Sequence, residues 1–280
     1  MAREFEPGSR SLERLCLHTI TTKPLPLEVA ADEYSRLGIG GISVWKEALA
    51  GRDPQRSGAR LRDAGLEIVS YVRGGFYPAL QASDRQKAVE DNKRLIDEAQ
   101  ALGAPLIVLV CGAAPGQSLP TSRKQILEGI AATIDHAKQA GIRLGIEPLH
   151  PMYADTRSAI NTLRQANDAV EQLASPQVGV TVDVFHLWWD PDLQSEIQRS
   201  ANLNALFSYH VCDWKAPTLD MLNDRGLMGE GVINVPEISQ WVEDAGFRGS
   251  IEVEIFSNTY WAMDQREYLE KIVRAFQSAT

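Results

Sequence analysis

The sequence predicts a (β/α)8 barrel, also called a TIM barrel, that forms a single domain over residues 1–280. Short apolar runs rich in Val and Ile alternate along the chain with longer polar stretches of helical period. Strands that are apolar on both faces and separated by helices form parallel sheets covered by helices. Eight such units of about 35 residues fit a closed barrel better than an open sheet.

The expected strands are the apolar runs themselves, and a glycine stands shortly before most of them. In RLGIGGISVW, DAGLEIVSYV and ALGAPLIVLV this glycine suits the end of the preceding helix, where a left-handed residue often follows the last turn. The strands are predicted at Arg14–His18, Ile39–Trp45, Glu67–Val72, Leu106–Cys111, Arg143–Glu147, Gly179–Asp183, Ala205–Val211 and Ser250–Ile255.

A helical segment fits after each strand. The segment after Leu80 is typical, because Ser83 is a suitable N-cap and apolar residues such as Val89 and Ile96 lie partly on one face. The helices are predicted at Leu27–Leu37, Pro54–Ala64, Asp84–Leu102, Ser122–Ala140, Thr156–Leu173, Asp192–Ala201, Pro236–Ala245 and Ala262–Phe276. An open, doubly wound sheet is less favoured, because no G-x-G-x-x-G follows the first strand.

Composition and charge narrow the classes of molecule that the protein could bind and the compartment in which it could work. A formal net charge of -9 without a basic cluster argues against a surface that binds nucleic acid or anionic lipid. No apolar stretch reaches the roughly 18 to 20 residues that cross a membrane. The N-terminal segment MAREFEPGSRSLERL has charges of both signs and no apolar core, so we expect no secretion signal. Cys16, Cys111 and Cys212 lie far apart in apolar runs, which predicts reduced core residues in a cytoplasmic protein.

Polar residues collect where the predicted strands end, which is the end at which TIM barrels carry their chemistry. The first four strands end at or near His18, Trp45, Arg73 and Cys111. The last four end at or near Glu147, Asp183, His210 and Glu254. Because these four strands are consecutive, we expect their three acids and one histidine to share one quadrant of the barrel mouth.

Each of these residues also has a structural interpretation. His18 alone is more typical of a hydrogen-bonded structural histidine than of a ligand. Glu147 or Asp183 could cap a neighbouring helix, and Glu254 could pair with Arg225. Together these interpretations are strained, because adjacent carboxylates repel one another unless a positive charge lies among them.

A divalent cation would supply that charge. Three carboxylates and one neutral imidazole form an oxygen-rich donor set, which suits Mn²⁺, Mg²⁺ or Co²⁺ better than a zinc site built on thiolates. The predicted ligands of one divalent metal ion are Glu147, Asp183, His210 and Glu254. His150 and His186 each follow a predicted ligand by three residues, where they could touch a bound substrate.

The segments GIEPLH, VDVFH, YHVCDW and IEVEIF resemble, in order and spacing, the sugar phosphate isomerase/epimerase family of xylose isomerase-like TIM barrels. The resemblance spans nearly the whole chain, and the GEG turn at 229–231 belongs to it. It implies one divalent metal ion, often Mn²⁺, held by the four predicted ligands. It also implies that Glu147 and Glu254 act as acid and base, and that His186 and Arg225 contact substrate.

This resemblance predicts a divalent-metal-dependent isomerase or epimerase that acts on a keto sugar by α-proton abstraction through an enediolate. The alternative is a lyase that eliminates a leaving group from a 3-keto glycoside or an inosose, as C-glycoside deglycosidases and inosose dehydratases do. His150 favours the lyase, since ketose 3-epimerases usually carry asparagine there and a histidine could act as the acid. A non-catalytic sugar-binding or partner subunit is a remote alternative, because all four ligand positions are present.

The expected substrate is a neutral sugar or cyclitol rather than a phosphorylated one. The loop RGLMGEG contains Glu230, and only Lys215 and Arg225 are basic near it. Aromatic residues of the mouth could stack on a sugar ring or simply pack the barrel rim, and His18 would lie among them. These residues are Trp45, Phe76, Trp188, Trp214 and Trp261. Aromatic residues near Trp261 suggest a homo-oligomer or a small accessory subunit.

Overall fold

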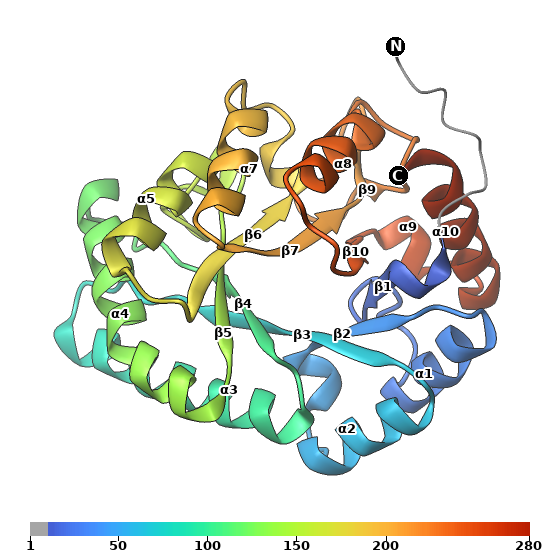
Figure 1. Ribbon diagram of the computed structural model, residues 1–280, viewed down its shortest axis with the longest axis horizontal. Coiled ribbons are helices and arrows are strands. Elements are labelled where there is room, and N and C mark those ends of the chain that lie inside the picture. Colours follow the sequence, from blue (N-terminus) through green and yellow to red (C-terminus); the bar gives the residue numbers. More distant parts are fainter. Residues whose placement is uncertain (1–10) are drawn as a thin grey trace.

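The computed structural model describes residues 11–280 and shows a closed barrel of eight strands with the long helices outside it (Figure 1). Around the barrel the strands follow the order β1-β2-β3-β4-β5-β6-β7-β10, and each neighbouring pair is parallel. This architecture confirms the predicted fold class. The prediction about the N-terminal segment rests mainly on residues 1–10, which lie outside the described residues.

The barrel strands coincide closely with the predicted apolar runs. Their bounds are β1 Leu15–His18, β2 Gly41–Trp45, β3 Glu67–Gly75, β4 Leu106–Val110, β5 Arg143–Glu147, β6 Val178–Asp183, β7 Leu206–Val211 and β10 Ile251–Val253. The largest difference is in β3, which was predicted to end at Val72. It continues because Gly74 and Gly75 still pair with Leu109 and Val110 of β4. Most strand residues are buried, as expected of a parallel barrel covered by helices.

The outer helices follow the strands in chain order. Their bounds are α1 Leu27–Arg36, α2 Pro54–Asp63, α3 Ala82–Leu102, α4 Leu119–Ala140, α5 Leu163–Leu173, α7 Leu193–Asn202, α8 Val235–Asp244 and α10 Gln265–Ala279. Glycine ends two of them as predicted, since Gly103 after α3 and Gly141 after α4 have φ of 89° and 72°. The predicted N-cap Ser83 was wrong, because α3 already begins at Ala82.

Three helix starts differ clearly from prediction. The helix predicted from Ser122 begins at Leu119, where the Ser118 side chain accepts a hydrogen bond from the amide of Thr121. The helix predicted from Thr156 begins at Leu163, where the Thr162 side chain accepts a hydrogen bond from the amide of Gln165. The residues before it form a turn, in which the amides of Arg157 and Ser158 bond to the carbonyl of Tyr153, and Ser158 forms a β-bridge with Gly112. The helix predicted from Ala262 begins at Gln265 as α10, where the Asp264 side chain caps it, and a separate short helix α9 (Asn258–Trp261) precedes the predicted start.

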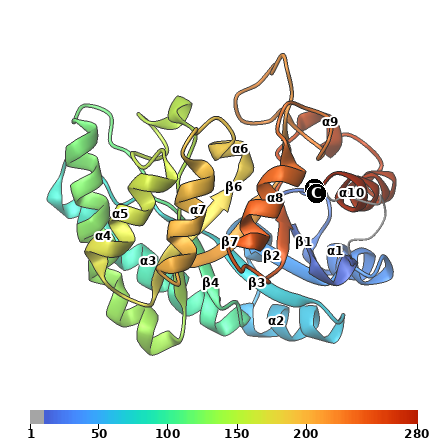
Figure 2. The same cartoon turned by 45° about the horizontal axis from the view of Figure 1, so that its top comes forward.

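The connections after the strands carry additional short elements. A two-stranded antiparallel ribbon, β8 (Asp213–Trp214) with β9 (Arg225–Gly226), follows β7. The short helix α6 (Val184–Leu187) follows β6 directly, and Figure 2 shows α6 and α9 on the same rim of the barrel. These connections therefore surround the end at which the strands carry their polar residues.

Two further findings bear on the sequence predictions. Among residues 11–280 the helices are too short or too polar to cross a membrane. Cys16, Cys111 and Cys212 are buried and free, as predicted.

Candidate metal centre

The four predicted ligands converge at the carboxyl ends of consecutive strands. Glu147 ends β5, Asp183 ends β6, His210 lies on β7, and Glu254 directly follows β10. One donor atom from each lies within 4.8 Å of the others, and all four side chains are buried. The group offers three carboxylates and one imidazole to a common point. That it binds a cation stays a prediction.

Glu147 and His210 face each other without a well-aligned hydrogen bond. Oε1 of Glu147 lies 3.1 Å from Nδ1 of His210, yet both atoms are buried and neither has a hydrogen-bond partner among the described residues. Burial alone lowers the pKa of His210, but the negative charges of Glu252 and Glu147 raise it to about 10. Buried polar atoms without partners are rare, and a cation bound by both atoms would satisfy them.

Asp183 has structural partners besides its place in this group. Its Oδ1 accepts a hydrogen bond of 2.8 Å from the amide of Phe185 and so caps α6. Its Oδ2 accepts one of 3.2 Å from Nη1 of Arg225. Burial raises the pKa of Asp183, and the positive charge of Arg225 opposes this only in part. The capping interpretation of Asp183 is therefore confirmed, and the residue also belongs to the group of four.

Arg225 brings a permanent positive charge to two of the predicted ligands. Its Nη1 donates to Oε2 of Glu254 at 3.0 Å as well as to Asp183, and it is buried. The guanidinium carbon lies 4.3 Å from the ring centre of Phe185 and 5.0 Å from that of Phe256. The pairing of Glu254 with Arg225 is confirmed. Arg225 fixes two carboxylates in place, whereas Glu147 receives no such contact from it.

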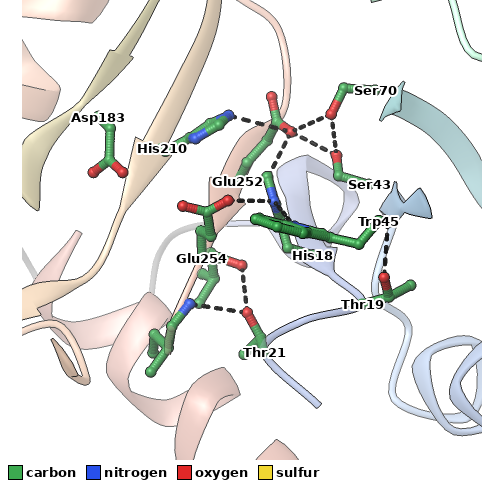
Figure 3. Close-up of polar contacts among 12 residues, drawn as sticks. His18, Thr19, Thr21, Ser43, Trp45, Ser70, Asp183, His210, Glu252 and Glu254 are labelled. Atoms are coloured by element: carbon green, nitrogen blue, oxygen red, sulfur yellow. Dashed lines mark hydrogen bonds and ion pairs between the residues drawn. The ribbon is translucent and has the colours of Figure 1, made fainter. Parts of the chain in front are cut away.

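A buried carboxylate that the sequence analysis missed lies deeper in the barrel than the four ligands. Oε2 of Glu252 lies 3.0 Å from Nε2 of His18 and 3.7 Å from Nε2 of His210. Its oxygens also accept hydrogen bonds from Ser43 and Ser70 (Figure 3) and from Ser208, all on other strands of the barrel. Burial alone raises the pKa of Glu252, but the two histidines lower it to about 2.

His18 joins this deeper carboxylate to the predicted metal ligands. Its Nε2 faces Glu252, and its Nδ1 lies 3.0 Å from Oε1 of Glu254 (Figure 3). Nδ1 also lies 3.1 Å from the indole N–H of Trp45, and one ring nitrogen cannot both donate to Glu254 and accept from Trp45. Burial lowers the pKa of His18, but the nearby carboxylates raise it by more, so the pKa lies above its ordinary value. This favours a ring that donates a hydrogen bond to Glu252 and another to Glu254. The indole of Trp45 then packs against His18 without donating a hydrogen bond to it.

His186 and His150 form a second pair above the predicted ligands. His186 is buried, and Nδ1 accepts a hydrogen bond of 3.2 Å from the amide of His150, while Nε2 lies 3.3 Å from Nη2 of Arg225. The His150 amide and the Arg225 guanidinium can only donate hydrogen bonds. A neutral imidazole has one acceptor nitrogen, so it accepts from one of them at a time. Burial, followed by the charge of Arg225, lowers the pKa of His186 well below its ordinary value, so the ring is neutral.

His150 and Trp214 lie at the rim rather than at the centre of the site. The ring of His150 lies 5.8 Å from that of Trp189 and 5.0 Å from that of Trp214. Its Nδ1 accepts a hydrogen bond from the amide of Met152. Trp214 also stacks on Phe185 at 4.8 Å. Neither residue lines the cavities described next, whereas Trp45 lines both of them.

Two connected cavities open above the predicted ligands. The inner one, about 30 Å³, is lined by residues that include Glu147, His186, Arg225 and Glu254. The outer one, about 650 Å³, is large enough for a small molecule of sugar size. Its lining includes Trp261, with Lys23 over the indole ring at 4.6 Å. The two cavities share Trp45, Arg73, Arg157, Leu222 and Phe256.

Comparison with known proteins shows what this chain is similar to. The sequence profile of the xylose isomerase-like TIM barrel family matches residues 31–275. Protein SMc04130 from Sinorhizobium meliloti 1021 is 44% identical with a TM-score of 0.92, over 95% of this chain and 98% of that one. The IOLI protein, solved with a bound zinc atom, is 18% identical with a TM-score of 0.82, over 94% of this chain and 96% of that one. At that identity the likeness concerns the fold alone.

Two relatives with assigned activities are more distant in sequence. Inosose isomerase of Halalkalibacterium halodurans is 23% identical over 199 residues, which cover 70% of this chain and 68% of the relative. The 3-dehydroshikimate dehydratase of Pseudomonas putida is 26% identical over 256 residues, which cover 88% of this chain and 38% of that longer relative. One of these activities is an isomerisation and the other an elimination.

Proposed function

The chain belongs to the xylose isomerase-like TIM barrel family, and from this premise we propose that it is a divalent-metal-dependent isomerase or epimerase. Its substrate would be a keto sugar or cyclitol that loses a proton from the carbon beside its carbonyl group. The observation that carries the proposal is the buried group of Glu147, Asp183, His210 and Glu254, of which Glu147 and Glu254 line the inner cavity. An isomerase among the relatives supports the reaction class.

The donor set fits a divalent cation on its own chemistry. It combines three carboxylates with one imidazole, and it leaves Oε1 of Glu147 and Nδ1 of His210 buried without hydrogen bonds. Mn²⁺, Mg²⁺ and Co²⁺ suit such a set, and Mn²⁺ is our first choice because it accepts both oxygen and imidazole ligands. When bound, such an ion would polarise a carbonyl group and stabilise the negative charge that develops when the neighbouring proton leaves.

Glu147 and Glu254 are proposed as the groups that move the proton. Both line the inner cavity, and β5 and β10 are separated in the barrel by β6 and β7. The two carboxylates therefore reach the cavity from different directions. Removal of a proton by one and its return by the other would invert a carbon centre, which is an epimerisation. Return of the proton to the adjacent carbon would give an isomerisation instead.

Arg225, His186, His18 and Trp45 are proposed to position the substrate and these carboxylates. Arg225 and His186 line the inner cavity and can offer N–H donors to substrate oxygens. Trp45 lines both cavities and can stack on a ring, while His18 acts from below by holding Glu254. Trp214 contacts the rim, so its effect on a substrate would pass through His150 or Phe185.

Elimination is the second candidate, and the similarity to 3-dehydroshikimate dehydratase supports it. The same loss of a proton would be followed by departure of a group from the next carbon, which needs an acid. The carboxyl group that has taken the α-proton, Glu147 or Glu254, could pass it to the leaving group, while His186, which lines the inner cavity with a neutral ring, would be a hydrogen-bond partner rather than the acid. His150 is proposed to orient His186 through the hydrogen bond from its amide.

Two measurements on the purified protein test the proposal. Metal analysis should find about one equivalent of a divalent ion, and zinc is included because a similar structure holds it. NMR in D₂O should then show exchange of the α-proton over a panel of keto sugars and inososes. Glu147→Gln should reduce this exchange by about 10²- to 10⁴-fold, the usual contribution of a general base. Glu128→Gln, on the exposed side of α4, is the matched control and should have no effect.

The outcome that contradicts the proposal is also clear. If the protein binds no divalent ion, or if Glu147→Gln exchanges the α-proton as fast as the wild type, the enzymatic assignment fails. Release of water from the substrate during exchange would select elimination over epimerisation.

A further inference from the structure

The outer cavity is strongly cationic, although the protein as a whole is acidic. Its lining contains four basic side chains and one acid; these are Lys23, Arg52, Arg73, Arg157 and Glu47. The basic residues come from segments that are far apart in the sequence. Arg73 and Arg157 also line the inner cavity, so they lie where the two cavities meet.

Two of the four basic side chains have partners that account for them. Arg52 forms an ion pair with Glu28, with Nε to Oε1 at 2.9 Å. Lys23 lies over the Trp261 ring and is exposed. These two residues therefore require no ligand to explain where they lie.

Arg73 and Arg157 differ, because within residues 11–280 neither side chain forms a hydrogen bond or an ion pair. Both are half-buried, and Nε of Arg73 is fully buried without a partner. Burial, followed by the positive charge of Arg157, lowers the pKa of Arg73. A buried donor without an acceptor and two neighbouring like charges are both unfavourable, so their presence at one place calls for an explanation.

Aromatic rings hold both guanidinium groups while leaving their N–H donors free. Arg73 lies 5.6 Å from the ring centre of Trp45 and 4.9 Å from that of Phe76. Arg157 lies 5.6 Å from that of Tyr153. Stacking of this kind satisfies the faces of a guanidinium but not its edges. The edges carry the forked donors that match a carboxylate or a phosphate.

We propose that Arg73 and Arg157 form an oxyanion-binding subsite where the two cavities meet, and that the substrate carries a carboxylate or phosphate group there. The reacting end of the substrate would lie over Glu147 and Glu254, and the anionic group would lie between the two arginines. The substrate part of this proposal rests on the proposed function. It replaces the expectation of a neutral sugar, which considered only the basic residues near loop 225–231.

Calorimetric titration of the Mn²⁺-loaded protein tests the subsite directly. Inorganic phosphate and malonate are the two probes, so that the experiment distinguishes a phosphate from a carboxylate. Arg73→Gln and Arg157→Gln should each weaken binding of the preferred probe by at least about 10-fold, because each removes charge-assisted hydrogen bonds. Arg52→Gln removes the same charge from the same cavity but from a paired residue, and should change affinity by less than about 2-fold.

Three results would overturn the subsite. They are failure of both probes to bind the wild type at millimolar concentration, equal binding by wild type and both arginine variants, and an equal loss in Arg52→Gln. Circular dichroism and the Mn²⁺ content of each variant show whether the fold and the metal site persist. Failure of the proposed function would appear separately, as α-proton exchange that survives Glu147→Gln while the anion measurements stay unchanged.

Discussion

Two regions of the candidate site carry opposite charges and differ in how those charges are partnered: the floor, formed by the four predicted metal ligands, and the neck, formed by Arg73 and Arg157. The floor holds the carboxylates, which are buried and mostly paired with histidines or with Arg225. The neck holds Arg73 and Arg157, which are half-buried and lack polar partners among residues 11–280. A paired charge contributes to the folded state by itself, whereas an unpaired one is best explained by a molecule that is bound from outside.

The carboxylates of the floor and the arginines of the neck lie close to one another but do not form ion pairs. Arg225 forms the hydrogen bonds to Asp183 and Glu254, whereas Arg73 feels the charge of Glu254 without contacting it. On our proposals the floor would bind a cation and the neck an anion. Substitutions in the floor should affect metal binding and stability, and substitutions in the neck should affect ligand binding alone.

The largest effect is expected from the loss of one floor ligand. Asp183→Asn keeps an oxygen that can cap α6 but removes the charge, and we expect metal affinity to fall by more than about 100-fold, since outer-shell changes alone cost 10- to 100-fold. Asp190→Asn is the matched control, because Asp190 is buried in the same segment and lies outside the group of four. Competition with a metal-binding dye measures both. Equal affinities would remove Asp183 from the site.

A large pH dependence of metal affinity is the next expectation. In the metal-free protein the carboxylates raise the pKa of His210 to about 10, although burial opposes them, so the ring is protonated at neutral pH. A metal ion needs the neutral ring, and its binding must release this proton. Affinity should therefore rise at least about 10-fold per pH unit, or at least about 100-fold from pH 6 to pH 8, since Asp183, whose pKa burial raises to about 7, also loses a proton in this range. Affinity that stays constant over this range would show that His210 is neutral or is not a ligand.

Glu252 should have a smaller effect, because it supports the ligands without joining them. Glu252→Gln removes the charge that faces His18 and His210, and we expect metal affinity to fall about 10-fold, at the lower end for outer-shell groups. The metal-free protein should lose about 1 to 3 kcal/mol of unfolding free energy, because buried serine donors lose a charged acceptor. Glu196→Gln, another buried glutamate, should leave metal affinity unchanged. Dye competition and urea unfolding measure the two effects.

The pH dependence of stability gives Glu252 a second readout. The histidines lower the pKa of Glu252 to about 2 despite its burial, compared with about 4.3 for an unfolded glutamate. Because the folded value is the lower one, this stabilisation is fully present above about pH 4.3 and is lost as the pH falls towards 2. The Glu252→Gln variant should therefore lose less stability than the wild type over that interval.

How far the sequence predicts this site depends on whether the signal is local. The barrel and the convergence of the four predicted ligands could be predicted, because apolar runs, glycines and polar strand ends are read within single segments. Glu252 also had a local signal, since it lies two residues before Glu254 in IEVEIF and alternate strand residues share a face. The proximity of Arg73 and Arg157 had no local signal in the sequence. It arises because β3 and the connection after β5 meet at the same cavity.

The lack of a local signal also explains why the start of α5 was misplaced. Thr156 to Thr162 has a composition that a helix tolerates, but its backbone is kept out of a helix by the bridge between Ser158 and Gly112. That contact joins segments far apart in the sequence and could not be predicted from either one. It also fixes the neck, because Arg157 is the neighbour of Ser158 and its carbonyl accepts a hydrogen bond from the Gly112 amide.

The smallest effect on stability is expected at the neck, where the same substitution can be compared with the floor. Arg73→Gln removes ring contacts that contribute about 0.5 to 1 kcal/mol, but it also removes an unsatisfied buried donor and a repulsion from Arg157. We therefore expect an unfolding free energy within about 1 kcal/mol of the wild type by urea unfolding. Arg225→Gln should lose about 3 to 5 kcal/mol in the metal-free protein, because it leaves Asp183 and Glu254 without their cation. If Arg73→Gln is as destabilising as Arg225→Gln, the neck arginine is a structural residue and the contrast between the two regions fails.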